Sequence, residues 1–196
     1  MNTLVPPHRP ARVSDALALA ELVNMAGEGL PLYVWSGMAA PGQGPWEVGQ
    51  ERARRDEGGF SYRNAIVREE DRRVVAGLIG YPLEASPGPV DYRQLPPMFV
   101  PLQQLEDLAP DTWYVNVLAT YPEYRSRGFG RELLSIAGSL ATSCGKSGLS
   151  LIVADSNAGA VRLYRRLGFT ERARRPMVKE GWQSPGSEWL LLVRSS

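Results

Sequence analysis

The spacing of apolar residues along the chain predicts short strands alternating with amphipathic helices. Runs of apolar or alternating residues are typical of strands, and apolar residues three and four positions apart are typical of helices. These patterns predict strands at residues 8–12, 63–69, 73–83, 112–120, 148–155, 169–178 and 187–194, and helices at 14–29, 45–59, 101–108, 128–145 and 156–168. Residues 31–44 are rich in aromatic residues and glycine, and we expect a loop there.

The order of these elements predicts the fold class. A strand around Val117, a helix and a strand around Val153 predict a parallel pair, because such a connection crosses one face of the sheet. The hairpins expected near either end add antiparallel strands. We therefore expect an α/β (α+β) fold, in which a mixed, mostly antiparallel sheet has a splayed parallel pair in the middle and helices on both faces. The chain shows no internal repeat or linker, so residues 1–196 are expected to form one domain.

One connection stands out by its length. Residues 84–110 are rich in proline, and a connection this long inside a compact domain is often functional. Three roles are open for this segment: a lid over a site, a contact in a homodimer, or a covering of the sheet.

The composition indicates a globular protein of the cytoplasm. The net charge of +1 gives no global reason to expect nucleic acid or a membrane as a partner. Cys144 is the single cysteine, so no disulfide can form within the chain, which suits a reducing compartment. The first residues lack the layout of a signal peptide, and no apolar run has the length of a membrane span. We expect no metal.

Residues 121–133, YPEYRSRGFGREL, place arginines and glycines between a predicted strand and a predicted helix. Successive backbone N–H groups at a helix start can bind a pyrophosphate, and glycine lets the backbone approach it closely. Arg125 and Arg127 would add positive charge. A solvated turn with two surface arginines explains the same residues equally well.

Two other phosphate-binding motifs fit the sequence poorly. The Gly-Lys-Ser of residues 145–147 would need a glycine five residues earlier to form a P-loop, and Leu140 stands there. We expect a helix end and a turn at that place. A dinucleotide-binding turn would need a third glycine where Leu133 stands.

Two motifs in the C-terminal half resemble the GNAT superfamily of acyl-CoA-dependent N-acyltransferases. The family's phosphate motif, Arg/Gln-x-x-Gly-x-Gly/Ala, is matched by Arg125, Gly128 and Gly130. The second motif is a strand, an Asn that opens a helix, a Tyr on that helix and a Gly-Phe pair. Its positions are matched by Asn157, Tyr164, Gly168 and Phe169. The N-terminal half matches the family only in the order of its elements.

The resemblance implies acetyl-CoA as the cosubstrate. Its pantetheine would pair like an extra strand with residues 118–120, where the strand of Leu118 splays from that of Ile152, and its pyrophosphate would rest on the N–H groups of residues 126–131. The implied cofactor-binding residues are Leu118, Ala119, Thr120, Arg125, Ser126, Arg127, Gly128, Phe129, Gly130, Arg131, Asn157 and Tyr164.

The resemblance also implies a direct acetyl transfer to a primary amine of an unidentified acceptor, a small molecule or a peptide. The backbone N–H of Leu118 would polarise the thioester carbonyl, and the Tyr164 phenol would protonate the leaving thiolate. Some members carry Glu or His at positions like Tyr114 and Asn116, and this chain has neither. Asn116 is expected to share a strand face with Leu118 and to hold a water. The missing base favours an alternative, a non-catalytic acyl-CoA-binding regulatory module.

Residues outside these motifs have ordinary structural interpretations. His8 and Glu123 are expected at the surface, and Asp155 as a cap or turn residue. The aromatic residues of the N-terminal half are core residues or the lining of an acceptor pocket. They are Tyr33, Trp35, Trp46, Phe60 and Tyr62.

Overall fold

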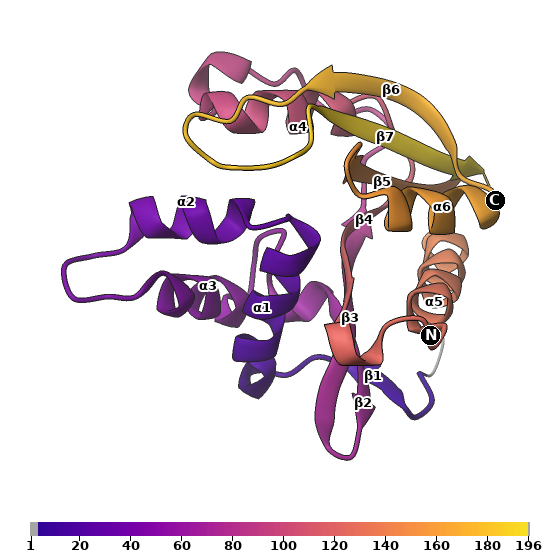
Figure 1. The fold of residues 1–196 in the computed structure, drawn as a ribbon. Helices are drawn as coiled ribbons and strands as arrows, with labels where there is room; N and C mark the ends of the chain where they lie inside the picture. The colour runs from indigo at the N-terminus through magenta and orange to yellow at the C-terminus, as the bar shows by residue number, and fades with distance from the viewer. Residues whose placement is uncertain (1–3, 196) are drawn as a thin grey trace. The chain divides into compact units, whose positions relative to one another are not determined.

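The computed structural model describes residues 4–195, which form seven strands and six α-helices (Figure 1). The strands are hydrogen-bonded in the order β1-β2-β3-β4-β5-β7-β6. The described chain divides into two compact units. The first consists of the chain up to Tyr81 with Asn116–Ile136, and the second of Pro82–Val115 with the chain from Ala137 onward. The expectation of one domain over residues 1–196 stays a prediction.

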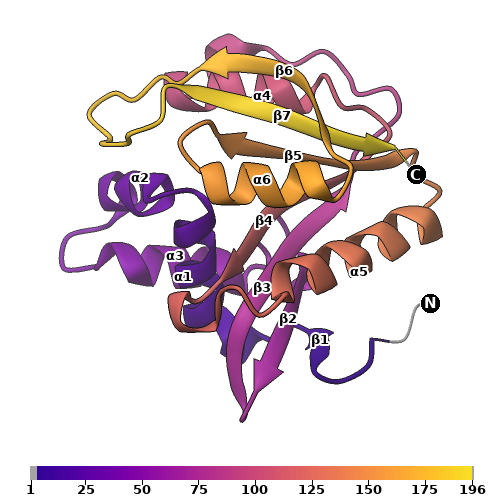
Figure 2. The same ribbon diagram turned by 45° about the vertical axis from the view of Figure 1, so that its right-hand side comes forward.

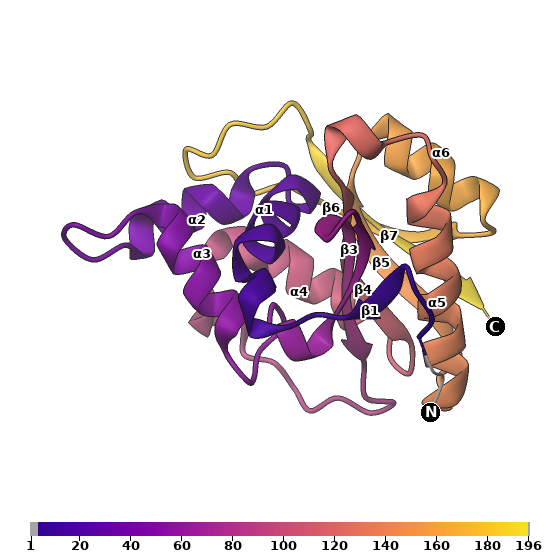
Figure 3. The same cartoon turned by 90° about the horizontal axis from the view of Figure 1, so that it is seen from below.

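The first unit packs three helices on one face of an antiparallel sheet. Its strands are β1 (His8–Pro10), β2 (Ala65–Glu70) and β3 (Arg73–Pro82), and its helices are α1 (Ala16–Ala26), α2 (Leu30–Met38) and α3 (Pro45–Arg54). Figure 3 shows the three helices gathered side by side. Leu19 and Val23 of α1 join Val67 and Ile79 of the strands in one apolar cluster, which is the core of this unit.

Helix α2 corrects the expectation of a loop for residues 31–38, whereas residues 39–44 form a loop as expected. The glycines of the segment favour a loop, yet Pro31 is the second residue of α2, and a proline is favourable in a first helical turn. The N–H of Leu32 donates to the Asn24 side chain of α1 at 3.0 Å, and Trp35 is buried in the core cluster. Packing of Trp35 therefore overrides a weak local preference.

Strand β4 (Trp113–Thr120) and helix α5 (Phe129–Ser143) both pass from one unit into the other. In the first unit, Val67 faces α1, whereas the next residue, Arg68, points to the opposite face. The Arg68 guanidinium lies 3.8 Å from the centre of the Phe129 ring, at the start of α5. Helices therefore cover both faces of this sheet, as expected.

The second unit builds a mixed sheet from the first residues of β4, β5 (Gly148–Ala154), β6 (Thr170–Pro176) and β7 (Glu188–Ser195). The parallel pairing of β4 with β5 is confirmed, in a register that sets Val115 opposite Leu151. Strand β7 pairs antiparallel with both β5 and β6. Helix α6 (Ala158–Arg166) and helix α4 (Val100–Glu106) lie on opposite faces of these strands (Figure 2).

The proline-rich segment 84–110 is tied to the second unit at both ends. The N–H of Leu83 donates to the carbonyl of Thr112, and the N–H of Asp111 donates to that of Glu84. The predicted helical turn at residues 101–108 is confirmed as α4, whose Leu105 is fully buried. The segment covers strands, while a role as lid or dimer contact stays a prediction. Within residues 4–195, no helix has both the length and the apolar character that crossing a membrane requires.

We predict opposite stability effects for two alanine substitutions in helices of the first unit. A Cβ on Gly49 of α3 would lie 2.5 Å from the rigid Trp35 ring, whereas a Cβ on Gly37 of α2 would meet nothing within 4 Å. Gly49→Ala should lower the free energy of unfolding by about 1–3 kcal/mol through overpacking. Gly37→Ala should raise it by about 0.5–1 kcal/mol through helix propensity. Urea denaturation measures both, and a stabilising Gly49→Ala would contradict the packing of α3 on Trp35.

Candidate functional site

The glycine turn (residues 125–131) joins β4 to α5 with an unusual backbone. Ser126 has a φ of 63° and Gly128 a φ of 89°, so two residues close together are left-handed. The carbonyl of Gly128 accepts the N–H groups of Arg131 and Glu132 and so starts the helix. In the described part of the chain, the N–H groups of residues 126–130 donate to no backbone carbonyl. The turn thus presents a row of free donors at a helix start, as an anion requires.

The arginines of the glycine turn are exposed but differ in their partners. The Arg125 Nε donates to the carbonyl of Thr120 at 3.3 Å, which folds its side chain back along the end of β4. Arg127 instead forms an ion pair with Glu70 at 3.0 Å, on β2. Within residues 4–195, the charge of Arg125 therefore has no carboxylate partner, whereas that of Arg127 is offset by Glu70.

Strand β4 loses its regular alternation between Asn116 and Val117. Val117 is buried in the core cluster with α1, and Tyr121, four residues on, donates its hydroxyl hydrogen to Glu21 of α1. Asn116 points to that same side, because its amide donates to the Gly59 carbonyl at 3.1 Å, next to Tyr81. The expectation that Asn116 shares a face with Leu118 and Thr120 is therefore wrong. Such an irregularity takes backbone groups out of a ladder.

The start of α6 has the predicted cap. The Asn157 side chain accepts the N–H of Ala160 at 3.1 Å, and the Asn157 carbonyl accepts that of Val161. The cap fixes α6 directly after β5.

Tyr164 lies two turns farther along α6 and is 7% exposed. Its ring packs against Phe169 with the ring centres 5.8 Å apart. Burial raises the pKa of the Tyr164 phenol, which is therefore protonated at neutral pH. Among the residues that the structure describes, none accepts or donates a hydrogen bond at its hydroxyl.

A family model for the acetyltransferase (GNAT) family matches residues 32–169, which include the glycine turn, Asn157 and Tyr164. The chain belongs to the GNAT family. The match covers more than half of the chain, and it begins before the first of the two motifs on which the resemblance was based.

Individual GNAT relatives agree with this assignment. The mycothiol acetyltransferase of Corynebacterium jeikeium is 32% identical over 66% of this chain and 39% of its own length. The L-methionine sulfoximine/L-methionine sulfone acetyltransferase of Salmonella typhimurium is 38% identical over 30% of this chain and 34% of its own length. The chain thus spans little more than a third of the length of these relatives. An N-acetyltransferase structure from Staphylococcus aureus Mu50 has the same fold, with a TM-score of 0.62, 21% identity, and coverage of 95% and 98% of the two chains.

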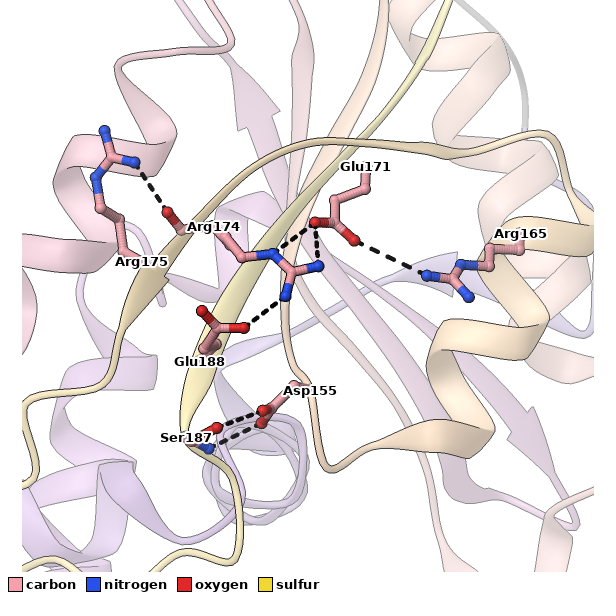
Figure 4. Close-up of polar contacts among 7 residues, drawn as sticks. All are labelled: Asp155, Arg165, Glu171, Arg174, Arg175, Ser187 and Glu188. Carbon is pink, nitrogen blue, oxygen red and sulfur yellow. Dashed lines mark hydrogen bonds and ion pairs between the residues drawn. The ribbon is translucent and has the colours of Figure 1, made fainter.

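Asp155 closes the loop between β6 and β7 in this GNAT protein. Its two carboxylate oxygens accept the N–H and the hydroxyl of Ser187, at 2.9 and 2.7 Å (Figure 4). Burial alone would raise the pKa of Asp155, but these hydrogen bonds hold it below its usual value. The expected turn role is confirmed, and a carboxylate stabilised in this way is a weak base.

The same close-up shows ion pairs between charged residues of β6, β7 and α6. Arg174 of β6 contacts Glu171 at 2.5 Å and Glu188 of β7 at 2.6 Å, while Arg165 of α6 lies 3.8 Å from Glu171. These pairs are partly exposed and mainly fix the register of the hairpin.

His8 is not at the surface, which corrects the sequence-based expectation. Its side chain is 12% exposed on β1, and its Nε2 lies 3.4 Å from the Glu132 carboxylate. Burial, and then the nearby Arg68, lower the pKa of His8. Glu123 is exposed, as expected.

The aromatic residues of the first unit divide between core and surface. Trp35 is buried, and Phe60 and Tyr62 pack against the same core cluster. Trp46 meets the Trp35 ring edge-on at 6.2 Å but is 37% exposed, and Tyr33 is 41% exposed. Trp35 is thus a core residue, while the lining of an acceptor pocket by the others stays a prediction.

We predict that the Asn157 cap contributes to stability independently of any ligand. Asn157→Ala should lower the free energy of unfolding by about 0.5–2 kcal/mol, because the N–H of Ala160 loses its acceptor. Asn157→Asp keeps an acceptor oxygen and should be close to wild type. Chemical denaturation of the two variants decides the matter; equal losses in both would mean that the amide makes a further contact.

Proposed function

We propose that this GNAT protein is an N-acetyltransferase that moves an acetyl group from acetyl-CoA to a primary amine by direct transfer. The observation that carries the proposal is the glycine turn, with its free N–H groups, left-handed Gly128 and flanking arginines. Backbone donors in fixed positions suit a pyrophosphate, because they recognise charge without side-chain rearrangement. The free N–H groups of residues 126–130 would hold it, with the side chains of Arg125 and Arg131 neutralising its charge. The sequence-based range of 126–131 is thereby shortened by one residue, because the N–H of Arg131 donates to the carbonyl of Gly128.

The end of β4 is the proposed site for pantetheine and for the thioester. Pantetheine carries two amides, which can pair with the backbone of residues 118–120 as an added strand would. The lost alternation at Asn116 supports this role, since it changes how the following backbone is presented. The N–H of Leu118 would then stabilise the negative charge that develops on the thioester oxygen.

Tyr164 is the proposed acid for the leaving thiolate. Burial raises the pKa of the Tyr164 phenol, which therefore keeps its proton at neutral pH and can donate a hydrogen bond to the thiolate while charge develops on sulfur. Because a thiol has a pKa of only about 8.5, this hydrogen bond, more than a completed proton transfer, would stabilise the leaving group. The buried, protonated Tyr164 hydroxyl forms no hydrogen bond within residues 4–195, and we propose that it donates to the bound cosubstrate. We also propose that Asn157 contacts the cofactor beside its capping role.

The amine acceptor must lose a proton before or during attack, since alkylamines are mostly charged at neutral pH. Asn116 cannot take this proton, but its side-chain oxygen can hold a water that relays it. A proton acceptor in bulk water then completes the step, and the acceptor amine would bind with its carbon chain away from the thioester.

The second candidate function is an acyl-CoA-binding module without catalysis, favoured by the absence of Glu or His at positions 114 and 116. Turnover of acetyl-CoA over a panel of primary amines, read by free-thiol release, separates the two. The panel should include L-methionine sulfoximine, for which the relative from Salmonella typhimurium is named, and amino-terminal peptides, the other acceptor class expected from the resemblance. Tight CoA binding without thiol release for any amine would favour the module.

We predict that Gly128→Ala weakens CoA binding whereas Gly145→Ala does not. Both glycines are left-handed, with φ of 89° and 68°, and a Cβ on either meets nothing within 4 Å. Each alanine should therefore destabilise the fold by a similar amount, about 1–2 kcal/mol. Only the Cβ at Gly128 would obstruct a bound pyrophosphate, and we expect an affinity loss of about tenfold or more from the lost backbone contacts. Calorimetric titration with CoA tests this; equal affinities in both variants would show that the glycine turn is not the phosphate site.

We predict that Tyr164→Phe lowers kcat far more than it weakens CoA binding. The phenol acts when charge develops on sulfur, so its loss should reduce kcat by about a hundred- to ten-thousandfold. The hydroxyl forms no hydrogen bond with any described residue, so the variant should keep the Tm of the wild type. Steady-state kinetics with an amine that the wild type acetylates give kcat, and calorimetric titration with CoA gives the affinity. An unchanged kcat would leave Tyr164 as a packing residue for Phe169.

A further inference from the structure

The side chain of Arg127 is 50% exposed, yet it takes part in a network of charges. Its two terminal nitrogens contact the two oxygens of Glu70, at 3.0 and 3.4 Å. Its guanidinium also lies over two rings, 5.0 Å from the centre of Phe129 and 5.6 Å from that of Tyr124. Arg127 therefore contacts one residue just before the glycine turn, Tyr124, and one where α5 starts, Phe129.

Glu70 is itself held in place on β2. It accepts from Arg68 at 3.2 Å, and Arg68 stacks on the Phe129 ring and also pairs with Glu132. The Arg68 side chain is 13% exposed and that of Glu70 is 23% exposed, so this part of the network is shielded from solvent. Phe129, at 4% exposure, is the apolar centre on which the two arginines rest.

A carboxylate next to a pyrophosphate site opposes binding by simple charge. If Arg127 bound the phosphates directly, Glu70 would compete for it, and the removal of the Glu70 charge would tighten CoA binding. If Glu70 fixes the position of Arg127, and Arg127 fixes the turn, the same removal would weaken binding. The two roles thus predict opposite signs.

We infer that the Glu70–Arg127 ion pair holds the glycine turn in its anion-binding conformation, which makes both residues positioning residues and not phosphate ligands. The inference rests on the proposed function, in which this turn binds the pyrophosphate of CoA. The left-handed Ser126 and Gly128 support it, because consecutive N–H groups converge only while such a backbone is maintained. A ligand that meets a prearranged turn loses less free energy in ordering it.

The test compares two carboxylate-to-amide variants by calorimetric titration with CoA. Glu70→Gln removes a partner of both Arg68 and Arg127, whereas Glu132→Gln removes a partner of Arg68 and His8 and leaves the Arg127 ion pair in place. We expect Glu70→Gln to weaken CoA binding about two- to fivefold, the range of a partly exposed ion pair, and Glu132→Gln to leave it unchanged or tighten it. Thermal unfolding of both variants checks that each is folded.

A third variant shows whether the two residues act as one unit. Arg127→Gln should weaken binding, and adding Glu70→Gln to it should weaken binding no further, because the pair is already broken. A tighter or unchanged Glu70→Gln, or an equal loss in Glu132→Gln, would overturn the inference while leaving CoA binding by the wild type intact. Failure of the wild type itself to bind CoA would instead overturn the proposed function.

Discussion

The structure depends on the backbone of one turn. Strand β4 must end and helix α5 must begin within a few residues, and the N–H groups between them find no protein acceptor in the described chain. Unsatisfied donors are unfavourable unless water or a ligand pairs with them. The left-handed Ser126 and Gly128 add local strain, which the surroundings have to support. We infer that the charges around Phe129 supply that support, which would link the stability of this region to the anion affinity that we propose for it.

The chemistry proposed for this protein divides its tasks between backbone and side chains. Backbone N–H groups would stabilise the permanent charge of the pyrophosphate and the charge that develops on the thioester oxygen. These N–H groups do not change protonation state. A phenol serves the sulfur, which gains its charge only when the bond to carbon breaks. Burial keeps the Tyr164 phenol protonated, and its free hydroxyl needs no protein contact to be broken before it acts. No side chain is proposed as a base for the nucleophile, so the acceptor amine would lose its proton to water.

The local order of residues was sufficient to predict most elements and both motifs. Apolar spacing places α5 and α6 correctly because their buried faces repeat with the helical period. Asn157 is a good cap wherever a helix follows it, so the sequence predicts a helix start there. For Gly128 the sequence predicts only that the backbone can approach a ligand, and its left-handed conformation comes from the structure. The parallel pairing of β4 and β5 follows from the helix between them, which leaves the chain little choice of direction.

By itself, then, the sequence determined the elements, their order, the family motifs and the residues with the chemistry to act, because these depend on near neighbours along the chain. Only the tertiary structure decided what distant residues do to one another. Helix α2 forms because Trp35 is buried, and His8 is shielded by Glu132 and Arg68. Arg127 is paired with Glu70, which lies 57 positions away beside a charged hairpin turn. Nothing in the local sequence around Glu70 indicates this partner. Such contacts depend on packing in three dimensions, which periodicity along a chain does not encode.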